Sequence, residues 1–357
     1  MISCNNFKQS VPDSYPIQKN YRTIDKRKRT KKKMKVYWHT SQRTKGIFLE
    51  ASRKRLAIYE HSIVKKKFSK NNAIRFIQLL IFLKKKKIKY IVFDGFSTEI
   101  LFLAISLKLL NIIIILRMKG GMNNEYLDGI LFKKFFLLNF VMNTYFSLIR
   151  NGIIMVSDTI LTVSSFLKSQ ILYELSFVDS KKIRVLLKPT VPEANLPVSL
   201  SFKRMNKIDK NINIITTLTG FRYFRKYDAI IYYHQSMLEV LRNNLNWHWI
   251  IAGTGDGLDY VKKKVLTSAH KLGIENQVQF IGFVHNTSAL YSDTDIFFYP
   301  TFRDTASQAL KESQLHALPA IINRSSCGPV EFIPPEAKAQ EQIIEEEDEL
   351  KKKCRSL

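Results

Sequence analysis

The sequence has few cysteines, and none lies in a pattern typical of a metal site or a disulfide. Cys4, Cys327 and Cys354 are widely separated in a chain of 357 residues. Closely spaced thiols are the usual signature of zinc sites and of small disulfide-rich secreted domains. The spacing argues against both classes, and it favours a reducing, cytoplasmic location.

The sequence also lacks a signal-peptide pattern and an uninterrupted apolar run long enough to cross a membrane. Its most apolar window, residues 100–118, contains Lys108 and Asn111, whereas a transmembrane helix needs about 20 consecutive apolar residues. We predict that this window forms a helix, a turn and a strand.

Residues 130–150 contain a second apolar stretch with a different character. Phe, Leu and Tyr residues stand there between Lys133, Lys134 and Arg150. Such a helix either packs against a core or lies on a membrane surface with anionic lipids. Both interpretations remain open.

Acidic residues are scarce relative to basic ones. Thirty Asp and Glu face 57 Lys and Arg, which gives a net charge of +27. This charge suits nucleic acid, an anionic membrane surface or phosphorylated substrates, although a bias of the source toward Lys, Ile, Asn and Phe would produce it as well. The chain lacks the interleaved aromatic and basic motifs of nucleic-acid folds, so we expect no nucleic-acid partner.

Charge and apolar patterning divide the chain into four segments. Residues 1–33 carry a basic run without apolar periodicity, which predicts a disordered tail. This tail either adheres to anionic lipid or nucleic acid, or it precedes a true start at Met34. Residues 34–200 and 208–335 each alternate strands and helices, which predicts two α/β domains. Residues 336–357 are predicted to form a charged helical tail.

The first domain has a clear pattern but a less specific site. Its predicted strands include residues 89–94, 111–118 and 158–165, and its predicted helices span about 71–86, 98–110 and 124–150. Open α/β folds bind ligands at the carboxyl edge of the sheet, where Arg117, Lys119, Gly120 and Gly121 could contact a phosphate. His39 either polarises an acceptor hydroxyl or has a structural role.

The most informative segment is residues 293–333, in which an apolar strand, a polar loop, a helix and a second apolar strand follow one another. Asp304 lies after the first strand, and Glu312 comes eight positions later. If the interval is helical, about 12 Å of rise separates them, so both carboxylates could reach one nucleotide sugar. Its diphosphate would meet amides at the helix start. These amides belong to Thr305, Ala306 and Ser307.

This segment resembles the donor-binding half of the family 4, or group 1, retaining glycosyltransferases. That family has GT-B architecture, with two facing Rossmann-like doubly wound domains, and a Glu-x7-Glu motif. The matching positions here are Asp304, Glu312, Leu318, Pro319, Gly328 and Glu331. Three positions depart from the family pattern: Asp304 replaces the first Glu, Ala317 replaces a Gly, and Cys327 replaces the first residue of a glycine pair.

The resemblance continues upstream and spans roughly residues 208–333. It implies that Lys226, helped by Arg222, neutralises the departing diphosphate, although Phe221 occupies the position of the family's arginine. Gly253 and Gly255 match the family's Gly-x-Gly between a strand and a helix.

The resemblance implies a metal-independent hexosyltransferase that moves a sugar from a UDP- or GDP-linked donor to a glycan or lipid-linked acceptor. Asp304 would hold the sugar, and Glu312 the ribose. Retention in this family is ascribed to front-face attack in which the leaving phosphate takes the proton, so neither a protein nucleophile nor a cofactor is expected. Such enzymes serve cell-surface polysaccharide or lipopolysaccharide synthesis. We expect a cytoplasmic protein, with peripheral binding to the membrane left open.

Other readings remain open. Asp293 and Asp295 resemble a metal-binding Asp-x-Asp, but they precede a strand where an acidic residue serves the structure. A GT-B sugar-nucleotide epimerase is one alternative, and an inactive truncated relative acting as a basic binding protein is another.

Twenty-six residues follow Glu331, fewer than the family usually has. We therefore expect an incompletely covered second sheet and a marginally stable or weakly active chain.

Overall fold

The computed structural model describes residues 34–40, 56–60, 72–120, 136–187, 201–324, 327–333 and 343–344. The predicted disordered tail, residues 1–33, lies outside this part. The chain divides into two compact units, Met1–Val92 and Phe93–Leu357. The predicted domain limits at about residue 200 remain a prediction.

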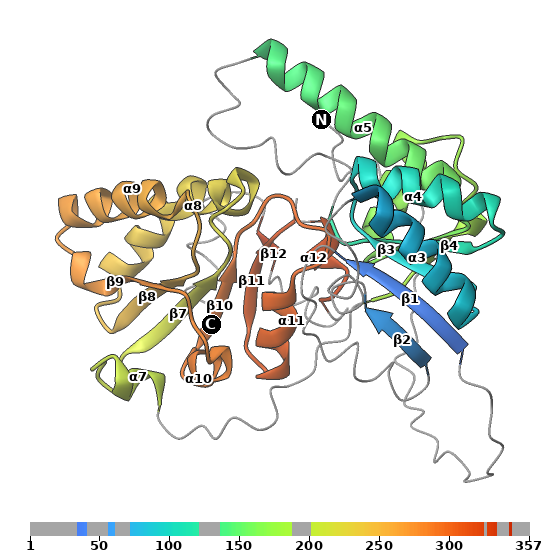
Figure 1. The fold of residues 1–357 in the computed structure, drawn as a ribbon. Helices are drawn as coiled ribbons and strands as arrows, with labels where there is room; N and C mark the ends of the chain where they lie inside the picture. Colours follow the sequence, from blue (N-terminus) through green and yellow to red (C-terminus); the bar gives the residue numbers. More distant parts are fainter. Residues whose placement is uncertain are drawn as a thin grey trace, which may run out of the picture. The chain divides into compact units, whose positions relative to one another are not determined.

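The first sheet has six strands in the order β2-β1-β3-β4-β5-β6 (Figure 1). The strands are β1 (Met34–Thr40), β2 (Leu56–Glu60), β3 (Tyr90–Asp94), β4 (Ile113–Met118), β5 (Thr159–Thr162) and β6 (Ile183–Val185). The helices are α3 (Asn72–Lys86), α4 (Thr98–Leu109), α5 (Phe136–Val156) and α6 (Ser165–Glu174), with a 3-10 turn η4 (Ser180–Lys182). The three predicted strands are confirmed as β3, β4 and β5. Their continuous apolar runs are typical of parallel strands covered on both faces.

The apolar window at residues 100–118 is a helix, a turn and a strand, as predicted. Helix α4 ends at Leu109, Asn111 turns the chain with a φ of 55°, and β4 begins at Ile113. Of the predicted helix over 124–150, the described part begins at Phe136 and continues to Val156. Within the described ranges, no helix is long and apolar enough to span a bilayer.

The second sheet also has six strands, in the order β12-β11-β10-β7-β8-β9. They are β7 (Asn213–Leu218), β8 (Trp247–Ala252), β9 (Val278–Gly282), β10 (Ile296–Tyr299), β11 (Ala320–Asn323) and β12 (Ile343–Ile344). The helices are α7 (Phe202–Met205), α8 (Phe224–Arg242), α9 (Leu258–Lys271), α10 (Thr287–Ser292), α11 (Gln308–Leu315) and α12 (Cys327–Val330), with a 3-10 turn η5 (Glu275–Gln277). The recorded pairings, β10 with β7 among them, are parallel.

Strand β12 differs from the prediction of a helix over residues 336–357. Ile343 and Ile344 pair with Ile322 and Asn323 of β11. Two apolar residues between charged ones are too short a strand for a periodicity argument to detect. The rest of this predicted helix lies outside the described residues, and the expected marginal stability remains a prediction.

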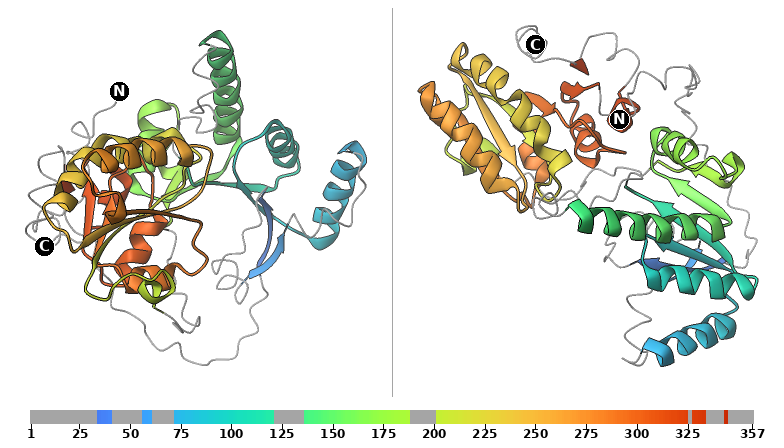
Figure 2. Two further views of the ribbon diagram at one scale, coloured as in Figure 1. Left: turned by 90° about the vertical axis from the view of Figure 1, so that its left-hand side faces the viewer. Right: turned by 90° about the horizontal axis from the view of Figure 1, so that it is seen from above.

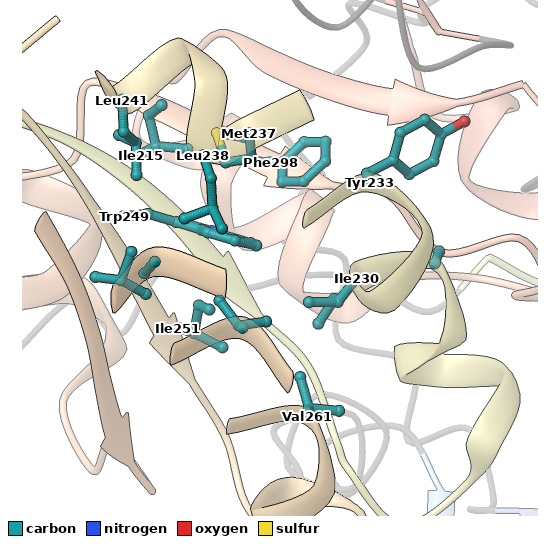
Figure 3. Close-up of a cluster of buried hydrophobic side chains, with 14 of the residues drawn as sticks. Ile215, Ile230, Tyr233, Met237, Leu238, Leu241, Trp249, Ile251, Val261 and Phe298 are labelled. Carbon is teal, nitrogen blue, oxygen red and sulfur yellow. The ribbon is translucent and has the colours of Figure 1, made fainter. Parts of the chain in front are cut away.

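Strands of the second sheet present alternate side chains to two apolar layers. Phe298 packs with Trp249 of β8 and Tyr233 of α8, in a cluster that also contains Val261 of α9 (Figure 3). Phe297 and Tyr299 point the other way, into a cluster with Leu310 of α11. This alternation, with period two, places helices on both faces of the sheet (Figures 1 and 2). The fold is thus the predicted Rossmann-like, doubly wound arrangement.

Candidate donor site

The candidate site begins at the loop that follows β10. Asp304 has a side chain only 8% exposed, and Lys226 Nζ lies 2.7 Å from its Oδ2. The Tyr299 hydroxyl donates a hydrogen bond to the same oxygen at 2.6 Å. Lys226 lies in the first turn of α8, the helix that follows β7. Because β7 and β10 are paired neighbours, residues following their carboxyl ends meet.

The amides next to Asp304 complete its hydrogen bonding. Its Oδ1 accepts hydrogen bonds from the Thr305 amide at 2.8 Å and from the Ala306 amide at 3.4 Å. Burial alone would raise the pKa of the Asp304 carboxyl, but the Lys226 ammonium and these hydrogen bonds outweigh burial and lower it. The pKa of the Tyr299 hydroxyl is raised, first by burial and then by the adjacent carboxylate. Asp304 is therefore ionised at neutral pH and accepts hydrogen bonds.

Helix α11 begins later than the eight-residue spacing suggested. Ser307 is its N-cap, with a side chain that accepts a hydrogen bond from the Leu310 amide at 3.0 Å. Only the second half of the interval between Asp304 and Glu312 is therefore helical. Glu312 lies on α11, where its charge adds to burial in raising the pKa of the Tyr291 hydroxyl.

Gly253 and Gly255 form the turn after β8, and both have positive φ angles, 133° and 145°. A Cβ on Gly255 would lie 2.4 Å from the Arg222 amide nitrogen. The Phe221 amide donates to the Thr254 carbonyl at 3.0 Å. The turns after β7 and β8 are therefore in direct backbone contact, which only glycine permits at position 255.

The two arginines near Lys226 differ in burial. Arg222, singled out from the sequence, is exposed in the turn before α8. Arg225, which the sequence analysis missed, is buried in the first turn of that helix. Its carbonyl accepts a hydrogen bond from the Thr301 hydroxyl at 3.3 Å. The adjacent Arg-Lys pair at a helix start was the available signal, and fully buried Phe221 takes no part in binding charge.

A second group of charges lies at the carboxyl edge of the first sheet. Asp94, the last residue of β3, has Arg117 Nη1 at 3.7 Å from its Oδ2, and Lys119 Nζ also pairs with this oxygen. Asp94 Oδ1 is buried and has no hydrogen-bond partner among the described residues. The predicted cations are thus brought together around a carboxylate that the sequence analysis did not single out. Gly120 follows them, and Gly121 lies outside the described residues.

Other sequence candidates have structural contacts or undescribed side chains. Asp293 Oδ2 accepts hydrogen bonds from the Ser201 hydroxyl at 2.6 Å and the Lys203 amide at 2.8 Å. Asp295 Oδ2 accepts one from the Ile214 amide at 2.7 Å. Both carboxylates therefore accept hydrogen bonds from backbone amides, which is a structural role. Among the described residues, no group of three His, Cys, Asp or Glu could hold a metal. The side chain of His39 lies outside the described residues.

Residues 213–357 match the model of a family described as glycosyl transferases group 1. A search of curated proteins found no significant match.

Several solved structures share the fold over most of their length. HepE from Anabaena, solved with UDP-glucose, has a TM-score of 0.62 and 12% identity, with 90% of this chain and 89% of that chain covered. A glycosyltransferase from Rickettsia africae has a TM-score of 0.58 and 16% identity, with 91% and 88% covered. WaaG, a glycosyltransferase involved in lipopolysaccharide biosynthesis, has a TM-score of 0.55 and 13% identity, with 90% of each chain covered.

These findings confirm the resemblance to group 1 glycosyltransferases and the GT-B architecture. At these identities, the structural likeness establishes the fold. What the site does depends on its own residues.

Proposed function

We propose that this chain is a group 1 glycosyltransferase that transfers a sugar, with retention, from a nucleotide-sugar donor to a hydroxyl acceptor. The single observation that carries the proposal is the pair of Lys226 and Asp304, 2.7 Å apart at the carboxyl ends of adjacent strands. A cation and an ionised carboxylate side by side fit the junction of a sugar and a diphosphate. The cation meets phosphate oxygens, and the carboxylate accepts hydrogen bonds from sugar hydroxyls.

Lys226 would provide the main catalytic charge. As the bond between sugar and phosphate breaks, negative charge grows on the diphosphate, and a fixed ammonium lowers the energy of that state. Arg225, buried one residue away, and exposed Arg222 are the further cations within reach of this turn. In the proposed front-face route, the leaving phosphate takes the proton of the acceptor hydroxyl. The protein therefore needs neither a nucleophile nor a metal.

The remaining donor contacts follow from the same arrangement. Gly253 and Gly255 keep side chains away from the turn where the nucleotide would lie, and Glu312 on α11 would bind the ribose. The amides of Thr305 and Ala306 already donate to Asp304. They would therefore hold the carboxylate in place, and the diphosphate would rely on cations.

A UDP-linked donor is favoured by the relatives, since HepE was solved with UDP-glucose. Calorimetry with UDP-glucose, GDP-mannose and ADP-glucose tests this choice. We expect micromolar binding of a UDP sugar that persists in EDTA. Donor binding that requires a divalent cation would contradict the metal-independent proposal, and binding of none of the three would contradict the site.

The acceptor is proposed to be lipid-linked because α5 carries an exposed apolar face. Five of its apolar side chains are 45–67% exposed, namely Phe140, Val141, Tyr145, Leu148 and Met155. At 100° per residue they fall within an arc of about 140°. The opposite side is buried through Ile149 and Ile153. Core packing and membrane binding, the two interpretations of this stretch, therefore both have support. Helix α5 packs on one side and has an exposed apolar surface on the other.

Together with the net charge of +27, this face suits the cytoplasmic surface of an anionic membrane. Sedimentation with vesicles of phosphatidylglycerol and phosphatidylcholine tests the idea. Changing Phe140 and Leu148 to Ser should reduce binding severalfold. Leu245→Ser, an equally exposed apolar position outside this face, should leave it intact. Equal binding by all forms would contradict the membrane assignment.

A sugar-nucleotide epimerase of the same architecture would bind the same donor. Product analysis without acceptor separates the two. A transferase should return the donor unchanged or hydrolyse it slowly, whereas rapid appearance of an epimeric nucleotide sugar would establish the alternative.

A further inference from the structure

Glu331 binds the start of a helix that follows the first sheet. Its Oε2 accepts a hydrogen bond from the Ser165 amide at 2.8 Å, and its Oε1 accepts one from the Phe166 amide. These are the first two residues of α6, where free amides and the helix dipole favour a negative charge. Both partners belong to the unit Phe93–Leu357.

The segment that carries Glu331 is also bound to the Asp304 loop. The Gly328 amide donates to the Asp304 carbonyl at 3.3 Å, and the Glu331 amide donates to the Gly328 carbonyl at 3.2 Å. A Cβ on Gly328 would lie 2.2 Å from the Thr305 carbonyl oxygen, so the two backbones touch. Two backbone hydrogen bonds therefore connect Glu331 to the loop of the proposed donor site.

A second contact joins this loop to the first sheet. The Thr305 hydroxyl donates to the Lys119 carbonyl at 2.9 Å. Lys119 follows β4, and Ser165 begins the helix after β5, which is the neighbour of β4. The loop is thus held at two adjacent points of the carboxyl edge of the first sheet, where open α/β folds bind ligands.

We propose that Glu331 is a positioning residue for sugar transfer. By holding α6, it fixes the Asp304 loop against the edge at which an acceptor would bind, so donor and acceptor meet in one geometry. This inference rests on the proposed function. Correct placement of two reactants lowers the barrier without strengthening the binding of either. Loss of the carboxylate should therefore reduce kcat and leave nucleotide affinity nearly unchanged.

Glu331→Gln keeps the side-chain size but removes the charge, and its amide nitrogen cannot accept one of the two hydrogen bonds. We expect kcat to fall by about 10- to 100-fold, with the Kd for UDP within about twofold of wild type. Hydrogen exchange should quicken at the amides of Ser165 and Phe166. Glu331→Asp should restore part of the loss. Glu275→Gln, a change at an exposed glutamate on η5, is the control and should produce none of these effects.

Ser165 offers a test from the other partner. Proline is tolerated at the first position of a helix, because the amide it lacks has no intrahelical acceptor there. The preceding residue, Ser164, is extended at φ −157° and ψ 160°, a conformation compatible with a following proline. Ser165→Pro should therefore remove one donor to Glu331 and preserve α6. Ser165→Ala keeps the amide and serves as the matched control.

The two changes should not add. Ser165→Pro should lower kcat in the wild type and have little further effect beside Glu331→Gln, because both remove one interaction. Unchanged exchange at the start of α6 in Glu331→Gln would overturn the proposal. So would equal losses in kcat and UDP affinity. A chain that binds no nucleotide sugar would contradict the donor site instead, and exchange at α6 would still decide whether Glu331 holds this helix.

Discussion

The two sheets each place a carboxylate and a lysine at their carboxyl edges, but the two pairs differ. Asp304 has hydrogen bonds to both oxygens, including those from Lys226 and two amides. Asp94 pairs with Lys119 through Oδ2, whereas its buried Oδ1 has no hydrogen-bond partner within the described part of the chain. The Asp304 carboxylate is therefore fully hydrogen-bonded by the protein itself, whereas the Asp94 carboxylate retains hydrogen-bonding capacity on one oxygen. This difference is consistent with the proposed donor site at Asp304 and with a proposed acceptor site at Asp94 that its ligand completes.

Removal of Lys226, the lysine paired with Asp304, should have the largest effect. Lys226→Ala removes the charge that opposes the growing charge of the diphosphate, so turnover should fall by about 10²–10³. It should also raise the pKa of the buried Asp304 carboxyl. Steady-state kinetics measure the first effect. Lys262→Ala, at an exposed position of α9, is the control. Near-normal turnover in Lys226→Ala would place the donor elsewhere.

Alanine substitutions of two glycines with positive φ should sharpen the contrast between the edges. Gly255→Ala forces a Cβ to within 2.4 Å of the Arg222 nitrogen at φ 145°, so unfolding free energy should fall by about 3 kcal/mol or more. Gly95, next to Asp94, has φ 120° but no atom within 4 Å of a Cβ. Gly95→Ala should cost only about 1–2 kcal/mol. Urea unfolding compares them, and equal losses would mean that the turns after β7 and β8 are not tightly packed.

Asp304 should also make stability depend on pH. Its pKa is lower in the folded chain than in an unfolded one, so the ionised group stabilises the fold. This contribution is complete above the unfolded pKa, about 3.9, and is lost as pH falls through the lower folded value. Asp304→Asn should cost about 1–3 kcal/mol at pH 7.

The measurement is the difference in unfolding free energy between wild type and Asp304→Asn from pH 7 to pH 3. We expect this difference to shrink toward the acid end. A difference that is constant across this range would show that the carboxylate does not carry the effect.

The smallest effect is expected at the first edge. Asp94→Asn removes the charge but keeps one acceptor oxygen, which can turn toward Lys119 and Arg117, so stability should change by about 1 kcal/mol. If this edge holds the acceptor, KM for the acceptor should rise severalfold while the Kd for UDP stays constant. A change in UDP affinity instead would mean that the two edges have been assigned in the wrong order.

The second sheet could be predicted from sequence because its strands are apolar, its turns contain glycine and its motifs lie in a fixed order. The contact between Lys226 and Asp304 could be inferred only through the resemblance, since the two residues are far apart in sequence and meet through the pairing of β7 with β10. Asp94 gave no signal, because an aspartate at a strand end is common. It stands out only through its two cationic partners, Arg117 on β4 and Lys119 just after β4.

Other features depended on packing that a single sequence does not reveal. Periodicity could not distinguish the buried side of α5, with Ile149 and Ile153, from its exposed side, with Phe140 and Leu148, since both sides are apolar. Glu331 was recognised only as a motif position, because its partners on α6 lie 166 and 165 residues away. Local patterns thus predict elements well, whereas contacts between distant segments require the fold.

Calorimetry of UDP and a UDP sugar with wild type, Lys226→Ala and Asp304→Ala tests the central claim most directly. The Lys226 ammonium should contact phosphate in both ligands, so Lys226→Ala should weaken both by a similar factor. The Asp304 carboxylate should contact only the sugar, so Asp304→Ala should abolish the preference for the sugar nucleotide and affect UDP much less. Wild-type affinity of both variants for both ligands would contradict the assignment of this pair as the donor site.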